Sequence, residues 1–84
     1  MISFENNAFD QLCQWEEEDK KIHRKITKLI IEIRRDPFQG TGKPEPLKGN
    51  LSGCWSRHIT DEHRLVYQVL PDHIVIVSCK FHYK

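Results

Sequence analysis

The sequence has no long apolar run, no secretion signal and no strong net charge, and each absence excludes a class of protein. No apolar stretch approaches the ~20 residues that a membrane-spanning helix needs, so no membrane contact is expected. The first residues, Met1 to Glu5, lack a basic segment followed by an apolar stretch, which predicts a cytoplasmic location. Hydrophobic residues make up 38% of the chain and charged residues 30%, which is typical of a compact soluble protein.

Metal-ligand pairs and a disulfide pattern are also missing. The chain has three cysteines, Cys13, Cys54 and Cys79, which are odd in number and far apart. Without a secretion signal they are expected to be reduced thiols. No CxxC or HxxxH pair is present, and the five histidines do not have the spacing of zinc ligands. We therefore expect neither a metal site nor a cofactor.

The overall charge argues mildly against a dedicated nucleic-acid-binding domain. The formal net charge is +1 and the isoelectric point is near 7.8, whereas such domains often have an isoelectric point above ~9. Four adjacent acids at residues 16–19 leave the half from residue 43 onward as the basic half. A second basic group lies on a predicted helix and is either a solvated face or a surface for rRNA phosphates: Lys20, Lys21, Arg24, Lys25 and Lys28.

A chain of 84 residues is expected to form one domain, residues 1–84. Its first part predicts a short strand at residues 2–4, followed by a helix for which Asn6 and Asn7 are candidate N-caps. This helix ends in the acidic run and carries apolar residues at helical spacing: Phe9, Leu12 and Cys13.

The second predicted helix has the clearest pattern in the chain. Its apolar residues recur at i, i+4, i+7, i+8 and i+11: Ile22, Ile26, Leu29, Ile30 and Ile33. Asp19 is a candidate N-cap, and Arg34 and Arg35 suit the negative end of the helix dipole. Pro37 disfavours helical geometry at Asp36, so the helix is expected to end there. The short gap between the two helices predicts an antiparallel hairpin.

Beyond the loop at residues 37–42 the apolar pattern changes to a period of two, which predicts strands. We expect strands near residues 45–48, 55–59, 63–70 and 74–81, with turns at 60–62 and 71–73. The last three strands should form an antiparallel meander. Because the two helices would cover one face of the sheet and leave the other open, the predicted fold class is α+β.

Side chains alternate between the two faces of a strand, so their spacing predicts which face each occupies. The side beneath the helices is expected to include Leu65, Tyr67, Val69, Val77, Cys79 and Phe81. The open side is expected to include Ser56, His58, Arg64, Ser78, Lys80 and His82. The face of Arg57 is ambiguous under this scheme.

The candidate functional residues are a carboxylate, several cationic or imidazole side chains and a tyrosine: Glu45, Lys48, Arg57, His58, Arg64, His82 and Tyr83. A base, a charge clamp and an acid are what metal-free cleavage of a phosphodiester needs. Plainer interpretations stay open, with Glu45 as a solvent-exposed acid in a proline-rich edge strand and Arg64 as an ion-pair partner of Glu62. His82 could be a surface histidine, and Tyr83 could be an aromatic residue at the edge of the core.

Several motifs, in the same order, resemble a known family over essentially the whole chain: Lys43-Pro44-Glu45-Pro46-Leu47-Lys48, Asn50-Leu51-Ser52-Gly53, Trp55-Ser56-Arg57, Glu62-His63-Arg64-Leu65-Val66-Tyr67 and His82-Tyr83. They are similar to the YoeB/Txe branch of the RelE toxin superfamily. The resemblance implies a microbial-RNase-like (RelE-like) fold, with two helices on one face of a twisted, mainly antiparallel sheet. It also implies an mRNA interferase that cuts the codon in the A site of the 70S ribosome without metal. The implied partners are a YefM-like antitoxin, the ribosome with its mRNA, and a second copy of the chain.

The resemblance further implies a role for each catalytic residue. Glu45 matches the general base for the ribose 2′-hydroxyl, and Arg64 matches the residue that stabilises the phosphorane-like charge. His82 matches the general acid for the departing 5′-oxygen, and Tyr83 the neighbouring tyrosine that shapes the site. The expected substrate contacts are Lys48, Arg57 and His58.

Two departures from the family pattern are visible. Many relatives have a second arginine where this chain has His58, and a neutral imidazole does not replace a guanidinium charge. Lys84 is an addition after the terminal His-Tyr pair. The first departure keeps an alternative function open, namely a catalytically decayed module that still binds antitoxin or ribosome, or takes part in operator autoregulation. A ribosome-independent RNase would need an affinity for naked RNA that a net charge of +1 hardly provides.

Overall fold

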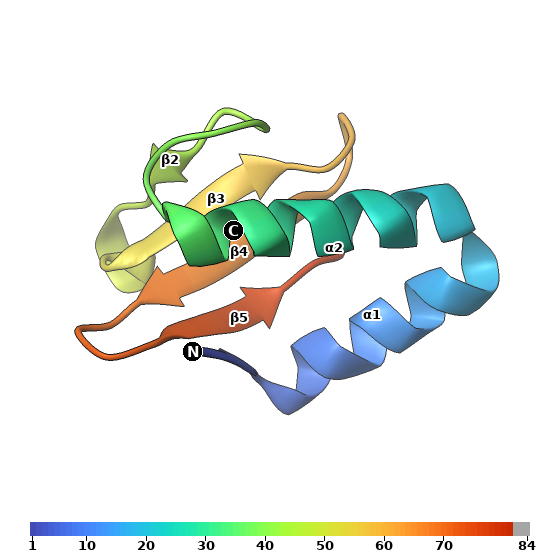
Figure 1. Ribbon diagram of the computed structural model, residues 1–84, viewed down its shortest axis with the longest axis horizontal. Coiled ribbons are helices and arrows are strands. Elements are labelled where there is room, and N and C mark those ends of the chain that lie inside the picture. Colours follow the sequence, from blue (N-terminus) through green and yellow to red (C-terminus); the bar gives the residue numbers. More distant parts are fainter. Residues whose placement is uncertain (82–84) are drawn as a thin grey trace.

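The structure is a computed structural model, and it describes residues 1–81. Its elements are β1 (Ile2–Phe4), α1 (Asn6–Glu18), α2 (Lys20–Arg35), β2 (Glu45–Pro46), a 3₁₀ turn (Gly49–Leu51), β3 (Cys54–His58), β4 (Arg64–Val69) and β5 (Ile74–Ser78). The two helices form a hairpin that lies across one face of the sheet (Figure 1). The predicted helical hairpin and the α+β class are confirmed.

The helix boundaries follow from local chemistry. The carboxylate of Asp19, between the helices, accepts hydrogen bonds from the backbone N–H groups of Lys21 and Ile22, so Asp19 caps α2 as predicted. α2 ends at Arg35 with Asp36 as its C-cap, as Pro37 predicts. The predicted asparagine caps of α1 are wrong. Glu5 occupies the N-cap position without a side-chain hydrogen bond, and the helix already begins at Asn6.

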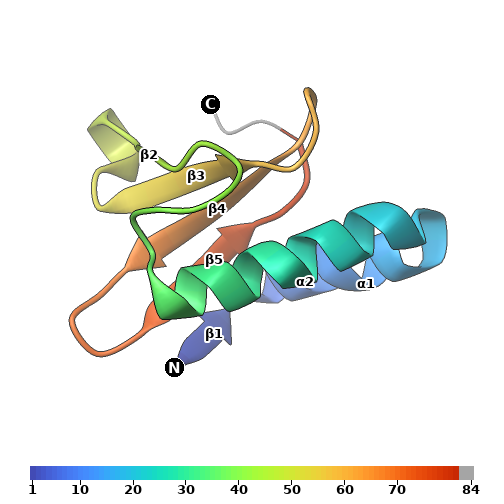
Figure 2. The same cartoon turned by 45° about the horizontal axis from the view of Figure 1, so that its top comes forward.

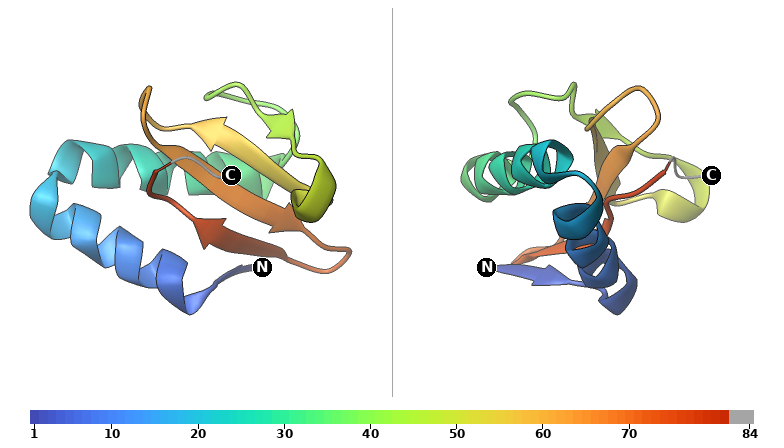
Figure 3. Two further views of the ribbon diagram at one scale, coloured as in Figure 1. Left: turned by 180° about the vertical axis from the view of Figure 1, so that it is seen from behind. Right: turned by 90° about the vertical axis from the view of Figure 1, so that its right-hand side faces the viewer.

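The sheet has the strand order β1-β5-β4-β3-β2, in which β1 runs parallel to β5 and every other pair is antiparallel. Figure 2 shows β1 beside β5 at one edge, and Figure 3 shows the helices on one side and the opposite face uncovered. The largest core cluster lies between helices and sheet and includes Ile26, Leu29, Ile33, Ile59, Leu65, Tyr67 and Ile76. Within residues 1–81, no helix combines the length and apolar character needed to cross a membrane.

A β-bulge changes the alternation that the sequence predicts for β5. Val66 pairs with Ser78 but Tyr67 pairs with Ile76, so Val77 is an extra residue on β5. Val77 therefore joins a small cluster on the open face instead of the helix-covered core, and its predicted face is wrong. Cys79, two residues further on, lies in the helix-covered core as predicted.

The end of the chain also differs from the predicted strand at residues 74–81, because β5 stops at Ser78. Lys80 turns toward α1, where its Nζ donates to Gln14 at 3.0 Å and to Glu18 at 3.1 Å. Its predicted place on the open face is wrong. Phe81 is 55% exposed, so it is not a buried residue beneath the helices. A period of two holds only while the backbone remains in the sheet, and here the backbone leaves it.

Candidate active site

The open face of the sheet brings candidate residues from three strands together. The register places Glu45 of β2 opposite Ser56 of β3, and Ser56 opposite Val66 of β4. His58, the last residue of β3, lies directly opposite Arg64, the first residue of β4. The left panel of Figure 3 views the sheet from the side that the helices do not cover. Side chains alternate along β3, so Ser56 and His58 share this face. The predicted placement of His58 and Arg64 together therefore agrees with the register, and Glu45 joins them from β2.

Glu45 and His58 are two candidate residues whose side chains approach each other. The Glu45 Oε1 and His58 Nε2 atoms are 3.9 Å apart, and the side chains are 58% and 36% exposed. Glu45 lies in the two-residue edge strand β2, between two prolines whose φ angles are restricted. Its carboxylate is thus held on a stiff backbone and remains accessible to a proton donor from solvent or substrate.

Arg64 begins β4, and its guanidinium is attached to the turn that precedes the strand. Its Nη1 donates to the backbone carbonyls of Thr60 at 2.7 Å, Asp61 at 3.0 Å and His63 at 3.2 Å. No ion pair joins Arg64 to Glu62 within the described residues; the Glu62 carboxylate is 3.7 Å from His63 instead. The turn carbonyls thus orient the charged group through one of its nitrogens, Nη1.

Lys48 and the chain end complete the list of candidates. Lys48 is exposed and follows Leu47, which is packed in the open-face cluster with Cys54 and Val66. His82 and Tyr83, the predicted acid and its neighbour, lie outside the described residues. Phe81, the last described residue, accepts a hydrogen bond on its carbonyl from the backbone N–H of Arg64 at 3.1 Å. The chain therefore reaches the start of β4 immediately before these two residues.

Arg57 does not belong to the open face, and its predicted substrate contact needs correction. It is 0% exposed and pairs in register with Leu65 of the helix-covered core. Its Nε donates to the Tyr67 hydroxyl at 3.1 Å, and both terminal nitrogens are hydrogen-bonded as well. Their acceptors are Glu32, Thr41, Asp36 and Gln39. A guanidinium this enclosed cannot reach a phosphate, because every hydrogen-bonding direction is already occupied within the fold.

The electrostatics around Arg57 agree with a structural role. Two hydrogen bonds from Thr41 lower the pKa of the Glu32 carboxyl, and the nearby positive charge of Arg57 lowers it further. Burial raises the pKa of the Tyr67 hydroxyl, although its hydrogen bond with Arg57 acts in the opposite direction. Tyr67 is therefore neutral and donates its proton to the Pro37 carbonyl at 2.6 Å. Glu32 is ionised and partly balances the buried guanidinium, at 3.4 Å from it.

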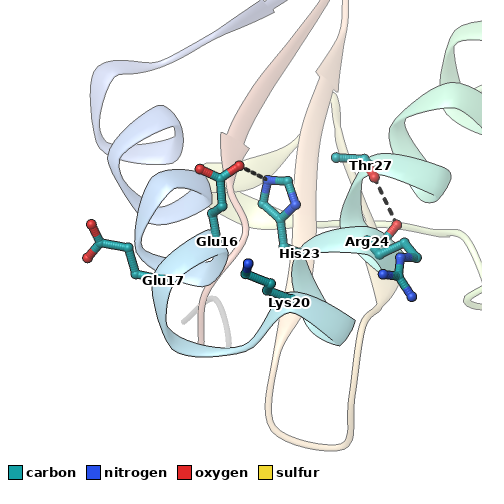
Figure 4. A pocket seen from close by; sticks show the side chains of 6 residues that line it. All are labelled: Glu16, Glu17, Lys20, His23, Arg24 and Thr27. Atoms are coloured by element: carbon teal, nitrogen blue, oxygen red, sulfur yellow. Dashed lines mark hydrogen bonds and ion pairs between the residues drawn. The ribbon is translucent and has the colours of Figure 1, made fainter.

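A surface hollow lies elsewhere, on the helical hairpin (Figure 4). It is lined by Glu16, Glu17, Lys20, His23, Arg24 and Thr27, and contains a 4.0 Å contact between Glu16 and His23. It shares no residue with the open-face site. Within residues 1–81, no group of three or more His, Cys, Asp and Glu side chains could hold a metal ion.

The sequence-based prediction did not include His63, which lies next to the candidate site residue Arg64. His63 was only part of a motif in the sequence, yet its ring accepts a hydrogen bond from Phe81 beside Arg64. Nothing in its spacing distinguishes it from a surface histidine before a strand. The signal is tertiary, because the partner is 18 residues away in the sequence.

The sequence matches known proteins over nearly its whole length. Residues 4–83 match the family described as YoeB-like toxin of bacterial type II toxin-antitoxin system. The chain is 54% identical over 82 residues to Toxin YoeB of Escherichia coli strain K12, and the match covers 98% of each protein.

Solved structures agree. The YoeB/ParE toxin from Agrobacterium tumefaciens has a TM-score of 0.94 with 42% identity over 98% of each chain. The toxin chain of the heterotetrameric YoeB-YefM complex from Staphylococcus aureus has a TM-score of 0.89 with 48% identity, covering 99% of this chain and 97% of that one. A YoeB dimer from the same organism has the same TM-score of 0.89 and 48% identity, covering 98% of this chain and 95% of that one.

A structure with much lower sequence identity shares the fold. YafQ from E. coli has a TM-score of 0.72 at 17% identity, covering 98% of this chain and 92% of that one, and so shares the fold alone. The predicted RelE-like fold is confirmed, as is the resemblance that led to it. This chain belongs to the YoeB-like toxin family of bacterial type II toxin–antitoxin systems.

Proposed function

We propose that this toxin is a ribosome-dependent endoribonuclease that cleaves mRNA in the ribosomal A site by metal-independent acid–base catalysis. The observation that carries the proposal is the meeting of an accessible carboxylate, Glu45, with His58 and Arg64 on the open face. The reaction needs a base, a cation and an acid, of which Glu45 and Arg64 would supply the first two.

The proposed reaction uses the RNA's own 2′-hydroxyl as nucleophile. Glu45 accepts the proton of this hydroxyl while its oxygen attacks the adjacent phosphorus. Arg64 stabilises the negative charge on the phosphorane-like transition state, with Lys48 and His58 contacting the substrate. His82 donates a proton to the departing 5′-oxygen, and Tyr83 shapes the site beside it. The products are a 2′,3′-cyclic phosphate and a free 5′-hydroxyl, and no water is consumed in this step.

The proposed partners follow from the family and from the charge of the chain. A YefM-like antitoxin would silence the toxin, as the S. aureus relative is seen in complex with YefM. A homodimer is the second proposed assembly, since that relative is also seen as a dimer. The net charge of +1 gives little affinity for naked RNA, so we assign substrate delivery to the ribosome and place the protein in the cytoplasm, where ribosomes are found.

Primer extension tests the proposal directly. Purified toxin, free of antitoxin, is stripped of metal with EDTA, which is then removed by dialysis so that the ribosomes keep their Mg²⁺. The stripped toxin is added to an mRNA on translating ribosomes and, in parallel, to the same mRNA without ribosomes. We expect cuts within A-site codons in the ribosome sample alone. Cutting by untreated toxin that is lost after stripping and restored by a transition metal would refute metal independence, and equal cutting of naked RNA would refute dependence on the ribosome.

A decayed toxin that binds without cutting is the second candidate, and one observation favours it. The imidazole of His58, at the position where the family pattern has an arginine in many relatives, lies near the Glu45 carboxylate and brings no permanent charge to the site. Binding to a YefM-like antitoxin combined with no scission in either primer-extension sample would favour this candidate over the nuclease.

A further inference from the structure

His63 is the most buried of the four histidines within residues 1–81, with 8% of its surface exposed. Its ring meets Trp15 of α1 edge-on, with centroids 4.8 Å apart and an angle of 82°. On another side it meets the Phe81 ring at 5.4 Å and 50°. The imidazole is thus held between α1 and the end of the chain, immediately before Arg64.

The hydrogen bond to Phe81 defines the protonation of this ring. The backbone N–H of Phe81 lies 2.7 Å from the His63 Nδ1 atom. A backbone amide can only donate, so Nδ1 must carry a lone pair and the proton of the neutral ring must be on Nε2. That nitrogen is 3.7 Å from the carboxylate of Glu62. His63 therefore acts as an acceptor in one specific tautomer.

Phe81 needs such a partner because of its backbone conformation. Its φ angle is +63°, in the left-handed region that L-residues other than glycine rarely adopt. Two hydrogen bonds hold it there, from its own N–H to His63 and from the Arg64 N–H to its carbonyl at 3.1 Å. Strained conformations of this kind persist only where the surroundings enforce them.

The segment before Phe81 is held by α1 instead. The Cys79 N–H donates to the Gln11 side chain at 2.8 Å, and its carbonyl accepts from Trp15 Nε1 at 2.9 Å. Lys80 Nζ is bonded to Gln14 and Glu18. Side chains of α1 therefore hold Cys79 and Lys80. His63 and the backbone of Arg64 hold Phe81, the last residue that the structure describes.

We propose that His63 is a positioning residue for the reaction: its Nδ1 clamps Phe81 at the start of β4, beside Arg64, at the point in the chain that immediately precedes the proposed general acid, His82. The inference rests on the proposed function for its account of His82, whereas the clamp itself depends only on the contacts of Phe81. His63 touches neither substrate nor reacting atoms in this account. It acts through the backbone that carries the general acid.

Two near-isosteric variants separate the clamp from simple packing. In His63→Asn the side-chain oxygen is attached to Cγ, like Nδ1, so it can still accept from Phe81. In His63→Gln the amide is one bond further out, where it corresponds to Nε2, so the acceptor is misplaced. His73→Gln is the matched control, because His73 lies in the β4–β5 turn at the other end of the strands and contacts Asp72.

The first measurement is hydrogen exchange of the Phe81 amide by NMR in the full chain. We expect exchange roughly tenfold faster in His63→Gln, as for the loss of one hydrogen bond, and close to wild type in His63→Asn and His73→Gln. An equally protected Phe81 amide in His63→Gln would overturn the clamp. This measurement needs no catalytic activity, so it stands apart from the proposed nuclease function.

The second measurement is single-turnover cleavage on saturating programmed ribosomes, well below each variant's melting temperature. We expect a loss of roughly 10²-fold in His63→Gln, the scale of an ångström-sized misplacement of a catalytic group, with rescue in His63→Asn. Equal rates in the two variants, beside an active wild type, would overturn the positioning role. A wild type that cuts nothing would instead overturn the proposed function, while amide exchange would still decide whether His63 holds Phe81.

Discussion

Arg57 donates its Nε–H to the hydroxyl of Tyr67 at 3.1 Å, joining two neighbouring strands beneath the helices. The same two side chains hold the loop between α2 and β2, through the carbonyls of Asp36 and Gln39 for Arg57 and of Pro37 for Tyr67. This loop leads directly to Glu45, and its Gly42 carbonyl accepts from the His58 N–H at 2.6 Å. A buried arginine thus supports the strand that carries the proposed base.

Replacing Arg57 with methionine should destabilise the fold strongly. The substitution keeps an unbranched chain but leaves the carbonyls of Asp36, Gln39 and Thr41 and the carboxylate of Glu32 without this donor, and it removes the N–H that the Tyr67 hydroxyl accepts. Breaking a buried charged network in this way costs about 3 kcal/mol or more. Urea unfolding of Arg57→Met measures the loss, and Arg24→Met, on the exposed face of α2, serves as the control. A midpoint equal to that of the control would show that Arg57 is not the anchor of the loop.

Glu32 should make stability depend on acid. Its folded pKa is lowered, first by the hydrogen bonds from Thr41 and then by Arg57, so the unfolded chain binds a proton more readily. The contribution is fully present above the ordinary carboxyl pKa and is lost as the pH falls through the lowered folded value. Unfolding midpoints measured between neutral and acid pH should therefore fall less steeply in Glu32→Gln. Parallel curves for the two proteins would contradict this.

The three cysteines should react very differently with an alkylating reagent. Burial raises the pKa of the Cys79 thiol to about 11 and also raises that of Cys54, whereas Cys13 is exposed. Thiolates are the reactive form, so native protein near neutral pH should be labelled at Cys13 alone. Peptide mass spectrometry after brief iodoacetamide treatment tests this, with urea-unfolded protein as the control that reacts at all three. Rapid labelling of Cys79 in the native protein would be the opposite result.

Glu45→Gln should abolish most cleavage without loss of the fold. The variant preserves side-chain size and removes only the base, and a positioned base typically contributes 10²- to 10⁴-fold, so we expect a loss of about that size. The rate on programmed ribosomes is the measurement. Glu17→Gln, on the solvated helical hairpin, should cut at the wild-type rate. Unchanged cleavage by the Glu45 variant would remove it from the mechanism.

His58→Arg should improve cleavage, because it supplies a permanent charge beside Glu45 and opposite Arg64. One added charge-assisted hydrogen bond to phosphate corresponds to roughly tenfold in rate. The test compares kcat/KM on programmed ribosomes for wild type and His58→Arg, with His73→Arg as a control for added charge away from the site. A slower His58→Arg enzyme would indicate that the imidazole has a role of its own beside Glu45.

Local chemistry made much of the fold predictable. The apolar stripe of α2, the Asp19 cap and the stop at Pro37 each depend on residues a few positions apart, and all three are confirmed. Alternation likewise predicted the helix-covered side of β4, where Leu65 and Tyr67 are fully buried. The family resemblance, carried by motifs in one order along the chain, was equally readable from the sequence and is confirmed.

Long-range contacts decided the rest. Arg57 is surrounded by hydrogen-bond acceptors from α2, the following loop and β4, which compensate its buried charge. The residues next to Arg57 in the sequence do not predict these contacts. The bulge at Val77 and the turn of the chain at Phe81 come from the pairing of β5 with β4 and from contacts with α1 and His63. Most helices and strands and the available chemical groups could be read from the chain, because they depend on residues that are neighbours in sequence. The side of the sheet that Arg57, Val77 and Lys80 face could not, because it depends on partners far away in the sequence.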